Sequence, residues 1–203
     1  TVNDGGDDVY TVCEGGSAEG LTGTPGTGLY NRADLDTNDD GMPDVSDDDC
    51  GDLPNITLDK ELVSAEVQPD GTYNVTYTID VTNNGGAAGQ YNLTDTPVFE
   101  DDVTINSGSY SGEESGALNT SGATTLTEDN AIAAGATETF TLVYNVTLDL
   151  TGTVNDGGDD VYTACDGGSG EGLTGTPGTG LYNRADLDTN DDGMPDVSDD
   201  DCG

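Results

Sequence analysis

Two long stretches of the chain alternate strictly between hydrophobic and polar residues. The hydrophobic face of the first consists of Tyr73, Val75, Tyr77, Ile79 and Val81. The hydrophobic face of the second consists of Phe140, Leu142, Tyr144, Val146 and Leu148. Alternation with a period of two is typical of a β-strand with one face in the core. Both stretches therefore predict long, half-buried strands.

Shorter stretches with strand character lie between turns rich in Gly, Ser and Asn. They are residues 8–13, residues 28–35, QYNLTDT from Gln90, DVTI from Asp102 and TTLT from Thr124. No part of the chain has a sustained helical period. We therefore expect an all-β fold, a sandwich of about seven to nine strands.

A segment of 51 residues occurs twice, as residues 1–51 and residues 153–203, at an offset of 152. The copies differ at three positions, where Val12, Glu14 and Ala18 become Ala164, Asp166 and Gly170. We expect both to adopt one conformation. Pro54 interrupts regular structure after the first copy. We therefore predict that residues 1–51 close a preceding repeat and that residues 52–203 form one complete repeat of a longer array.

Each copy contains an acidic loop, DTNDDGMPDVSD, that begins at Asp36 and again at Asp188. Calcium loops carry ligands at positions 1, 3, 5, 7, 9 and 12 and turn at a glycine in position 6. Position 7 offers a backbone carbonyl, so methionine is acceptable there. The predicted Ca²⁺ ligands are Asp36, Asn38, Asp40, Met42, Asp44 and Asp47, and in the second copy Asp188, Asn190, Asp192, Met194, Asp196 and Asp199.

We interpret the motif as an isolated calcium loop, because no amphipathic helix flanks it and Asp47 stands where EF-hands usually have glutamate. A solvated acidic linker is the alternative. The loop ends three residues before Cys50 and the next strand starts near Ile56. We therefore expect the ion to lie at the joint between successive domains and to stiffen it.

The charge balance is extreme, with 42 acidic and 3 basic side chains and a net charge of −39. Such a chain lacks the Lys and Arg that nucleic acid or an anionic membrane requires. Adaptation to high salt would also explain the acid, but eight carboxylates within residues 34–49 favour local cation binding. No apolar run approaches the ~20 residues of a membrane span, so we expect no membrane insertion in this fragment.

Four cysteines, two in each copy, suggest an oxidising compartment. Pairing within each copy, Cys13 with Cys50 and Cys165 with Cys202, treats both copies alike and keeps each bridge local; free thiols are the alternative. The chain has no His and no pair of acids set apart for catalysis, so we expect no enzymatic activity. Sequons permit glycans at Asn55, Asn74, Asn92, Asn119 and Asn145.

Three stretches carry a resemblance to a known family: YNVTYTIDVTNNGGAAGQYNLTDT, AIAAGATETFTLVYNVTL and GTGLYNRADL. With the acidic Cys-Gly-Asp-Leu-Pro joint, they resemble the conserved-repeat, Ig-like β-sandwich domains of bacterial and archaeal surface proteins, over most of residues 53–203. The resemblance implies a spacer or fibre module. The motif DTNDDGMPD resembles thrombospondin type 3-like calcium motifs, with Asn38 where those often have Asp and with one unit per period.

These features together predict an extracellular, cell-surface protein. We expect a structural subunit of a calcium-stabilised fibre, stalk or filament, whose partners are neighbouring copies of the same repeat. The alternative is a repeat adhesin that binds carbohydrate or neighbouring cells. The chain has no Trp and copies its loops unchanged, which favours the fibre.

Overall fold

The computed structural model describes residues 10–15, 23–151, 160–167 and 175–203 of the chain. These residues form eleven strands and no helix, which confirms the all-β prediction. The chain divides into two compact units. Unit 1 comprises Thr1–Ile56, Asn83–Gly89 and Ala133–Ala136, and unit 2 comprises Thr57–Thr82, Gln90–Ile132 and Thr137–Gly203.

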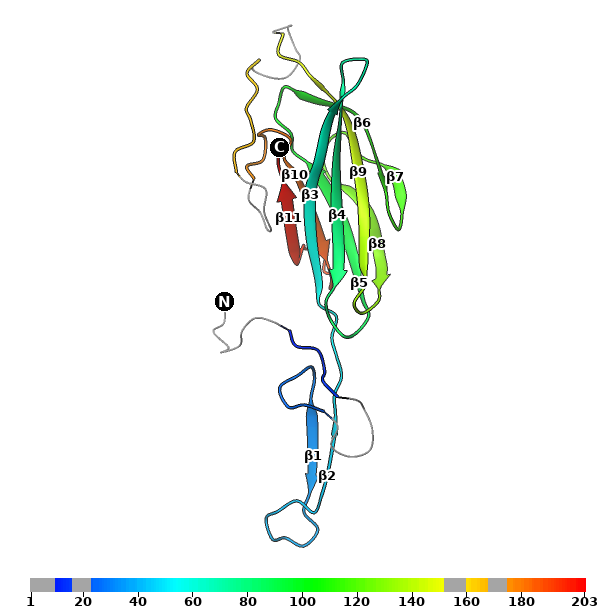
Figure 1. Cartoon of the computed structure of the whole chain (residues 1–203), viewed down its shortest axis with the longest axis vertical. Helices are drawn as coiled ribbons and strands as arrows, with labels where there is room; N and C mark the ends of the chain where they lie inside the picture. Colours follow the sequence, from blue (N-terminus) through cyan, green and yellow to red (C-terminus); the bar gives the residue numbers. More distant parts are fainter. Residues whose placement is uncertain (1–9, 16–22, 152–159, 168–174) are drawn as a thin grey trace. The chain divides into compact units, whose positions relative to one another are not determined.

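A two-layer β-sandwich makes up unit 2 (Figure 1). One sheet has the order β3 (Ile56–Val67), β4 (Tyr73–Asn83), β9 (Thr137–Leu148), β6 (Val103–Ser111) and β7 (Ser115–Ala117). The other has the order β11 (Val197–Asp201), β10 (Asn183–Asp188), β5 (Gly89–Pro97) and β8 (Thr124–Ile132). The two sheets together contain nine strands, which agrees with the expected seven to nine.

The core lies between the two sheets and is built by the alternating residues that the sequence marks. Val75, Tyr77, Ile79 and Val81 of β4 are fully buried, as are Phe140, Leu142 and Tyr144 of β9. β5 contributes Tyr91 and Leu93, and β8 contributes Leu126 and Ile132. The prediction of two long, half-buried strands is therefore confirmed, with only the end residues Tyr73 and Leu148 left partly exposed.

The only lysine of the chain lies inside this core. Lys60 Nζ is 2.6 Å from Asp95 Oδ1, and both side chains are fully buried. The Tyr144 hydroxyl donates to Asp95 Oδ2 at 2.6 Å, and Asn183 Nδ2 donates to the same oxygen at 3.2 Å. A buried charge is tolerated only when it is paired and hydrogen-bonded. This network joins β3, β5, β9 and β10.

The second copy of the repeated segment supplies half of the four-stranded sheet. Its strand β10 pairs antiparallel with β5 from Asn183↔Pro97 to Asp188↔Asn92, and β11 pairs with the other edge of β10. The first copy forms the equivalent hairpin in unit 1, β1 (Asn31–Leu35) with β2 (Val45–Asp49). The registers agree, with Asn31 opposite Asp49 and Asn183 opposite Asp201.

The structure corrects two local predictions about strands. Residues 8–13 were expected to form a strand, but the described part, Tyr10 to Cys13, is irregular. Conversely, the acidic run VSDDD forms strands β2 and β11, which the sequence reading assigned to the calcium loop and its surroundings. Cross-strand pairing with β1 and β10 overrides the low strand propensity of aspartate.

The structure places the first acidic loop within its hairpin, while the expected position of an ion at the joint between domains stays a prediction. The loop connects β1 to β2 and so lies at the tip of the hairpin, whereas Cys50 and the joint follow the open end. Within unit 1, Asp52 Oδ1 accepts hydrogen bonds from the Cys13 amide at 2.6 Å and the Tyr10 hydroxyl at 3.1 Å.

Replacing Lys60 tests how far the sandwich depends on its buried ion pair. Lys60→Met leaves the Asp95 carboxylate buried without its counter-charge, which we expect to lower the free energy of unfolding by about 3–5 kcal/mol. Arg184→Met removes a cation from a partly exposed pair with Asp186 and should cost below about 1 kcal/mol. Urea unfolding followed by circular dichroism measures both.

The double variant Lys60→Met/Asp95→Asn provides the internal check. It removes both charges, so it should be more stable than Lys60→Met alone. Equal stability of Lys60→Met and the unaltered chain would show that the ion pair does not hold the core.

Candidate functional site

Each acidic loop is a compact turn built on two residues with left-handed backbone. In the first copy Asp39 has φ 61° and Gly41 has φ 82°; in the second copy Asp191 has φ 58° and Gly193 has φ 79°. Aspartate and glycine are among the residues that adopt this conformation most readily. The near identity of the angles shows that the sequence alone sets the loop's shape.

Most of the predicted ligand side chains fold back onto the backbone of their own loop. Asp36 Oδ1 accepts from the amides of Asn38 and Asp39 at 3.1 and 2.8 Å, and Oδ2 accepts from Gly41 at 2.8 Å. Asn38 Oδ1 and Asp40 Oδ1 accept from the amides two residues further on. The second copy repeats every one of these bonds within 0.1 Å.

Asp44 closes the loop from its far side. Its Oδ2 accepts from both the amide and the hydroxyl of Thr37, and its Oδ1 accepts from Asn38 Nδ2 at 3.3 Å. Asp196 makes the same three bonds in the second copy. Hydrogen bonds thus connect positions 1, 3, 5 and 9 of the predicted ligand set, but Asp36, Asp40 and Asp44 do not form a described group of three acids with carboxylate oxygens within 4.8 Å of one another.

The hydrogen bonds also favour the charged form of two ligands. The Gly41 amide is the main cause that lowers the pKa of Asp36, and the Thr37 hydroxyl is the main cause that lowers the pKa of Asp44. Both carboxylates are therefore ionised at neutral pH. Carboxylate, amide and carbonyl oxygens are the ligands that Ca²⁺ prefers, and the predicted binding of this ion to the loop stays a prediction.

Position 12 has a different place in the structure. Asp47 and Asp199 lie in β2 and β11. Both carboxylate oxygens of Asp199 accept backbone hydrogen bonds, from Lys60 at 2.7 Å and from Asp200 at 3.0 Å. The role of position 12 as a calcium ligand stays a prediction, while its role in binding strand β3 is one that the sequence reading missed.

The alternating acids of β11 form a contact between the two sheets of the sandwich. Asp199 Oδ2 accepts from the Lys60 amide, and Asp201 Oδ2 accepts from the Leu62 amide at 2.6 Å. Side chains thus satisfy backbone N–H groups of β3, which is an edge strand of its sheet. A strand edge satisfied in this way is protected from pairing with other chains.

The second copy contacts the rest of the sandwich beyond its strands as well. The amides of Val98 and Glu100 donate to the carbonyls of Tyr182 and Gly180 at 3.0 and 2.9 Å. The Tyr77 hydroxyl donates to the Leu181 carbonyl. Strand β10, the turn before it and strand β11 therefore form one continuous docking surface.

The first copy has the same local structure with this surface exposed. The Leu35 side chain is 57% exposed, whereas its counterpart Leu187 is fully buried. The same contrast holds for four further pairs: Asn31 and Asn183, Ala33 and Ala185, Asp47 and Asp199, and Asp49 and Asp201. The local sequence is thus enough to form the hairpin in both copies. Contact with β5 and β3 buries the hairpin of the second copy.

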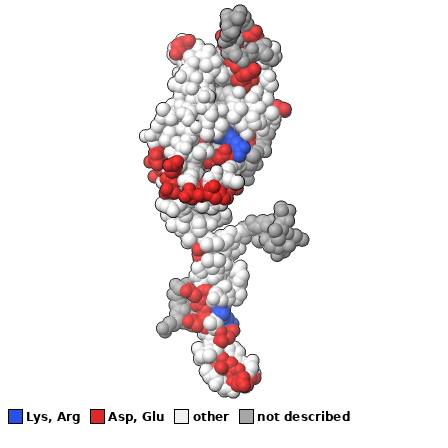
Figure 2. Space-filling model, turned by 180° about the vertical axis from the view of Figure 1, so that it is seen from behind, with Lys and Arg blue, Asp and Glu red and all other residues white. Residues whose placement is uncertain are grey.

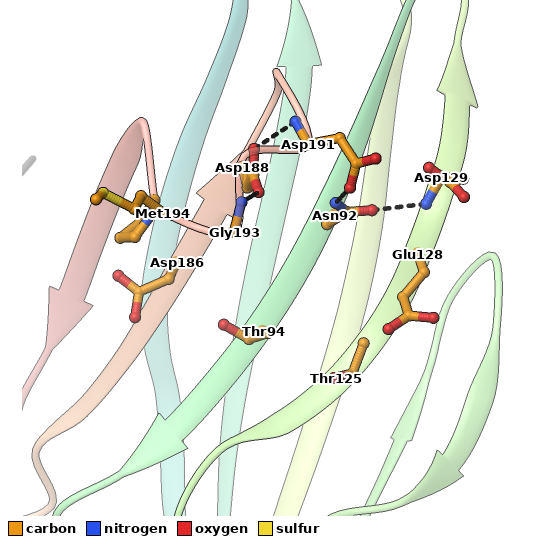
Figure 3. A pocket seen from close by; sticks show the side chains of 11 residues that line it. Asn92, Thr94, Thr125, Glu128, Asp129, Asp186, Asp188, Asp191, Gly193 and Met194 are labelled. Carbon is orange, nitrogen blue, oxygen red and sulfur yellow. Dashed lines mark hydrogen bonds between the residues drawn. The ribbon is translucent and has the colours of Figure 1, made fainter.

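A groove of about 460 Å³ lies beside the loop of the second copy, against β5 and β8 (Figure 3). Asn92 links its walls, because its Nδ2 donates to Asp191 Oδ1 at 3.2 Å and its Oδ1 accepts from the Asp129 amide at 2.7 Å. The lining residues are Asn92, Thr94, Thr125, Glu128, Asp129, Asp186, Asp188, Asp191, Gly193, Met194 and Pro195. Five carboxylates and no aromatic ring line this groove, which is unlike a carbohydrate-binding platform.

Both predicted disulfides are present, which confirms pairing within each copy. Cys13 is bonded to Cys50 and Cys165 to Cys202, with Cα atoms 5.9 and 5.8 Å apart. Each bridge ties an irregular segment to the residue that follows β2 or β11. The bridge thereby fixes Cys13 and Cys165 to the hairpins of their copies.

Figure 2 shows acidic side chains gathered in patches, with small basic spots beside them. No helix among the described residues is long and apolar enough to cross a membrane.

No family model and no curated protein matches the sequence. The resemblance to microbial surface repeats therefore stays a prediction.

Calorimetric titration with CaCl₂ tests the two loops directly. We expect each loop to bind one ion with a dissociation constant of roughly 10⁻⁴–10⁻³ M, as in extracellular calcium modules. Asp36→Ala and Asp188→Ala should each remove one binding event, because Asp36 and Asp188 organise three amides of their loops.

Asp39→Asn is the matched control. It removes a charge from the same loop at a position outside the ligand set, and asparagine tolerates the left-handed backbone of Asp39. Loss of binding in Asp39→Asn equal to that in Asp36→Ala would show that only total charge matters and that the loop is not a calcium site.

Proposed function

We propose that the chain is part of an extracellular structural fibre or stalk built from tandem β-sandwich repeats. In this proposal the repeated segment is a closing module, which supplies the last two strands of a sandwich. The second copy closes the sandwich formed by residues 57–148. The first copy closes another sandwich of the same kind, either earlier in a longer chain or in a neighbouring chain.

One observation carries the proposal: two nearly identical segments share a conformation, but only one of them is buried. The exposed copy presents a β-strand whose hydrophobic and polar groups match the contacts of its buried twin. Burying a leucine fully contributes about 1.5–3 kcal/mol relative to leaving it exposed. Leu35 is more than half exposed, so docking β1 on a strand like β5 is favourable.

Calcium has a specific place in this proposal. In the second copy the acidic loop touches strand β5, since Asn92 donates to Asp191. An ion that holds the loop in shape therefore strengthens the contact between closing module and sandwich. At free calcium about 100-fold above the dissociation constant, binding stabilises the folded form by about 2.7 kcal/mol per site.

The composition and the disulfides support the proposed location and the absence of enzymatic chemistry. Disulfides persist in oxidising compartments, and calcium at the required concentration is found outside cells. Histidine is absent from the sequence, and the carboxylates of the groove lie next to the calcium loop. These features favour a structural role over the adhesin alternative and over catalysis.

Leucine substitutions in the two copies test the closing-module proposal. Leu187→Asp places a charge in the core and should destabilise docking of the second copy by about 3 kcal/mol or more. The vacated β5 edge is then free for the first copy of another molecule, which joins chains head to tail. Sedimentation velocity should show concentration-dependent assembly of Leu187→Asp.

Leu35→Asp is the matched control, at the equivalent position of the exposed copy. Alone it should leave the chain as stable as before, and combined with Leu187→Asp it should abolish assembly. A Leu187→Asp variant that stays monomeric at all concentrations, or one that assembles equally well with Leu35→Asp, would refute the proposal.

A further inference from the structure

The turn between β5 and β6 carries three consecutive acids, Glu100, Asp101 and Asp102. One carboxylate oxygen of each lies within 4.8 Å of those of the other two. Glu100 is 1% exposed and Asp102 is 4% exposed, whereas Asp101 faces solvent. Two buried carboxylates at such a distance repel each other strongly, because the protein interior screens charge poorly.

Backbone amides satisfy only part of this buried charge. Glu100 accepts from the amides of Asp102 at 3.0 Å and Thr163 at 3.2 Å. Asp102 Oδ1 accepts from the Asp160 amide at 3.3 Å. Asp102 Oδ2 is buried and has no hydrogen-bond partner. An unpartnered buried carboxylate oxygen is costly and requires an explanation, such as a bound ion.

The protein's own side chains offer no cation to this site. The sequence contains three basic residues and no histidine. Lys60 is paired with Asp95 in the core, Arg184 with Asp186 and Arg32 with Asp34. A cation that neutralises these acids would therefore come from solution.

We propose that Glu100, Asp101 and Asp102 bind a calcium ion at a site separate from the two acidic loops. A ligand set made only of carboxylate oxygens suits a hard divalent cation. Such an ion would neutralise both buried acids, whereas a shared proton would neutralise one. This inference concerns unit 2 alone and does not depend on fibre formation.

The site spans the contact between the sandwich and its closing module. Thr163 and Asp160 of the second copy donate amides to the acids, and the Glu100 amide donates to the Gly180 carbonyl at 2.9 Å. An ion that fixes the carboxylates therefore orders the acceptors to which the second copy binds. Calcium bound at this site therefore strengthens the contact between the second copy and the rest of the sandwich. This contact lies at the end of β5 opposite to the acidic loop.

Calorimetric titration with CaCl₂ in the Asp36→Ala/Asp188→Ala background tests the site, since both acidic loops are disabled there. We expect one remaining binding event. Glu100→Gln keeps the size of the side chain but removes its charge, and should weaken this event roughly tenfold or more, because ligand charge sets calcium affinity. Glu113→Gln, the same change at an exposed glutamate, should leave it unchanged.

Asp101→Asn provides a second variant that does not disturb the interior, because Asp101 is exposed. It should fold normally and also bind calcium more weakly than the background. Absence of a binding event in the background, or equal affinity in the Glu100→Gln and Glu113→Gln variants, would overturn the site and assign the neutralising charge to a proton. Neither result would alter the assembly expected of Leu187→Asp.

Discussion

Strand β5 lies between β8 and β10 in its sheet, and β10 belongs to the second copy of the repeated segment. Without this copy, the edge of β5 that pairs with β10 would present free amides and carbonyls. Unpaired strand edges attract other strands, and proteins therefore cover them. Here β10 covers this edge over six residue pairs. The rest of the sandwich depends on this pairing, because Asn183 reaches the buried Asp95 through it and β11 is brought against β3. The repeated segment is therefore an integral part of the fold.

The scarcity of basic residues makes the electrostatics of the chain unusual. Its single lysine is used inside the core, where it pairs with Asp95, and each arginine pairs with an aspartate two residues away. The other carboxylates must be solvated, hydrogen-bonded to amides or bound to cations. Hydrogen bonds from backbone amides to carboxylates recur in the acidic loops, along β11 and at Glu100. Backbone amides can orient these acids, but they cannot neutralise them, and this difference is the physical basis for expecting bound cations.

Part of the fold was predictable because burial leaves a periodic trace in the sequence. The faces of β4 and β9 are pure examples, and the turns around them are marked by Asn and Gly. Strands β2 and β11 could not be found in this way, since VSDDD has no hydrophobic alternation. In β11, Asp199 and Asp201 are buried and bind the Lys60 and Leu62 amides, more than 130 residues away in sequence, whereas Asp47 and Asp49 of β2 are exposed. The spacing of the acidic loop identified four residues that the structure links by hydrogen bonds, but it did not reveal that position 12 belongs to a strand.

The two copies separate what local sequence decides from what tertiary contact decides. Loop angles, disulfides and hairpin register are the same in both, although their surroundings differ. Exposure is not the same, as Leu35 and Leu187 show. A free hairpin does not need leucine at this position, nor an asparagine that reaches a buried carboxylate. The first copy retains both, and in the proposed fibre a partner surface like that of β5 and β3 would be the environment in which those residues contribute to stability.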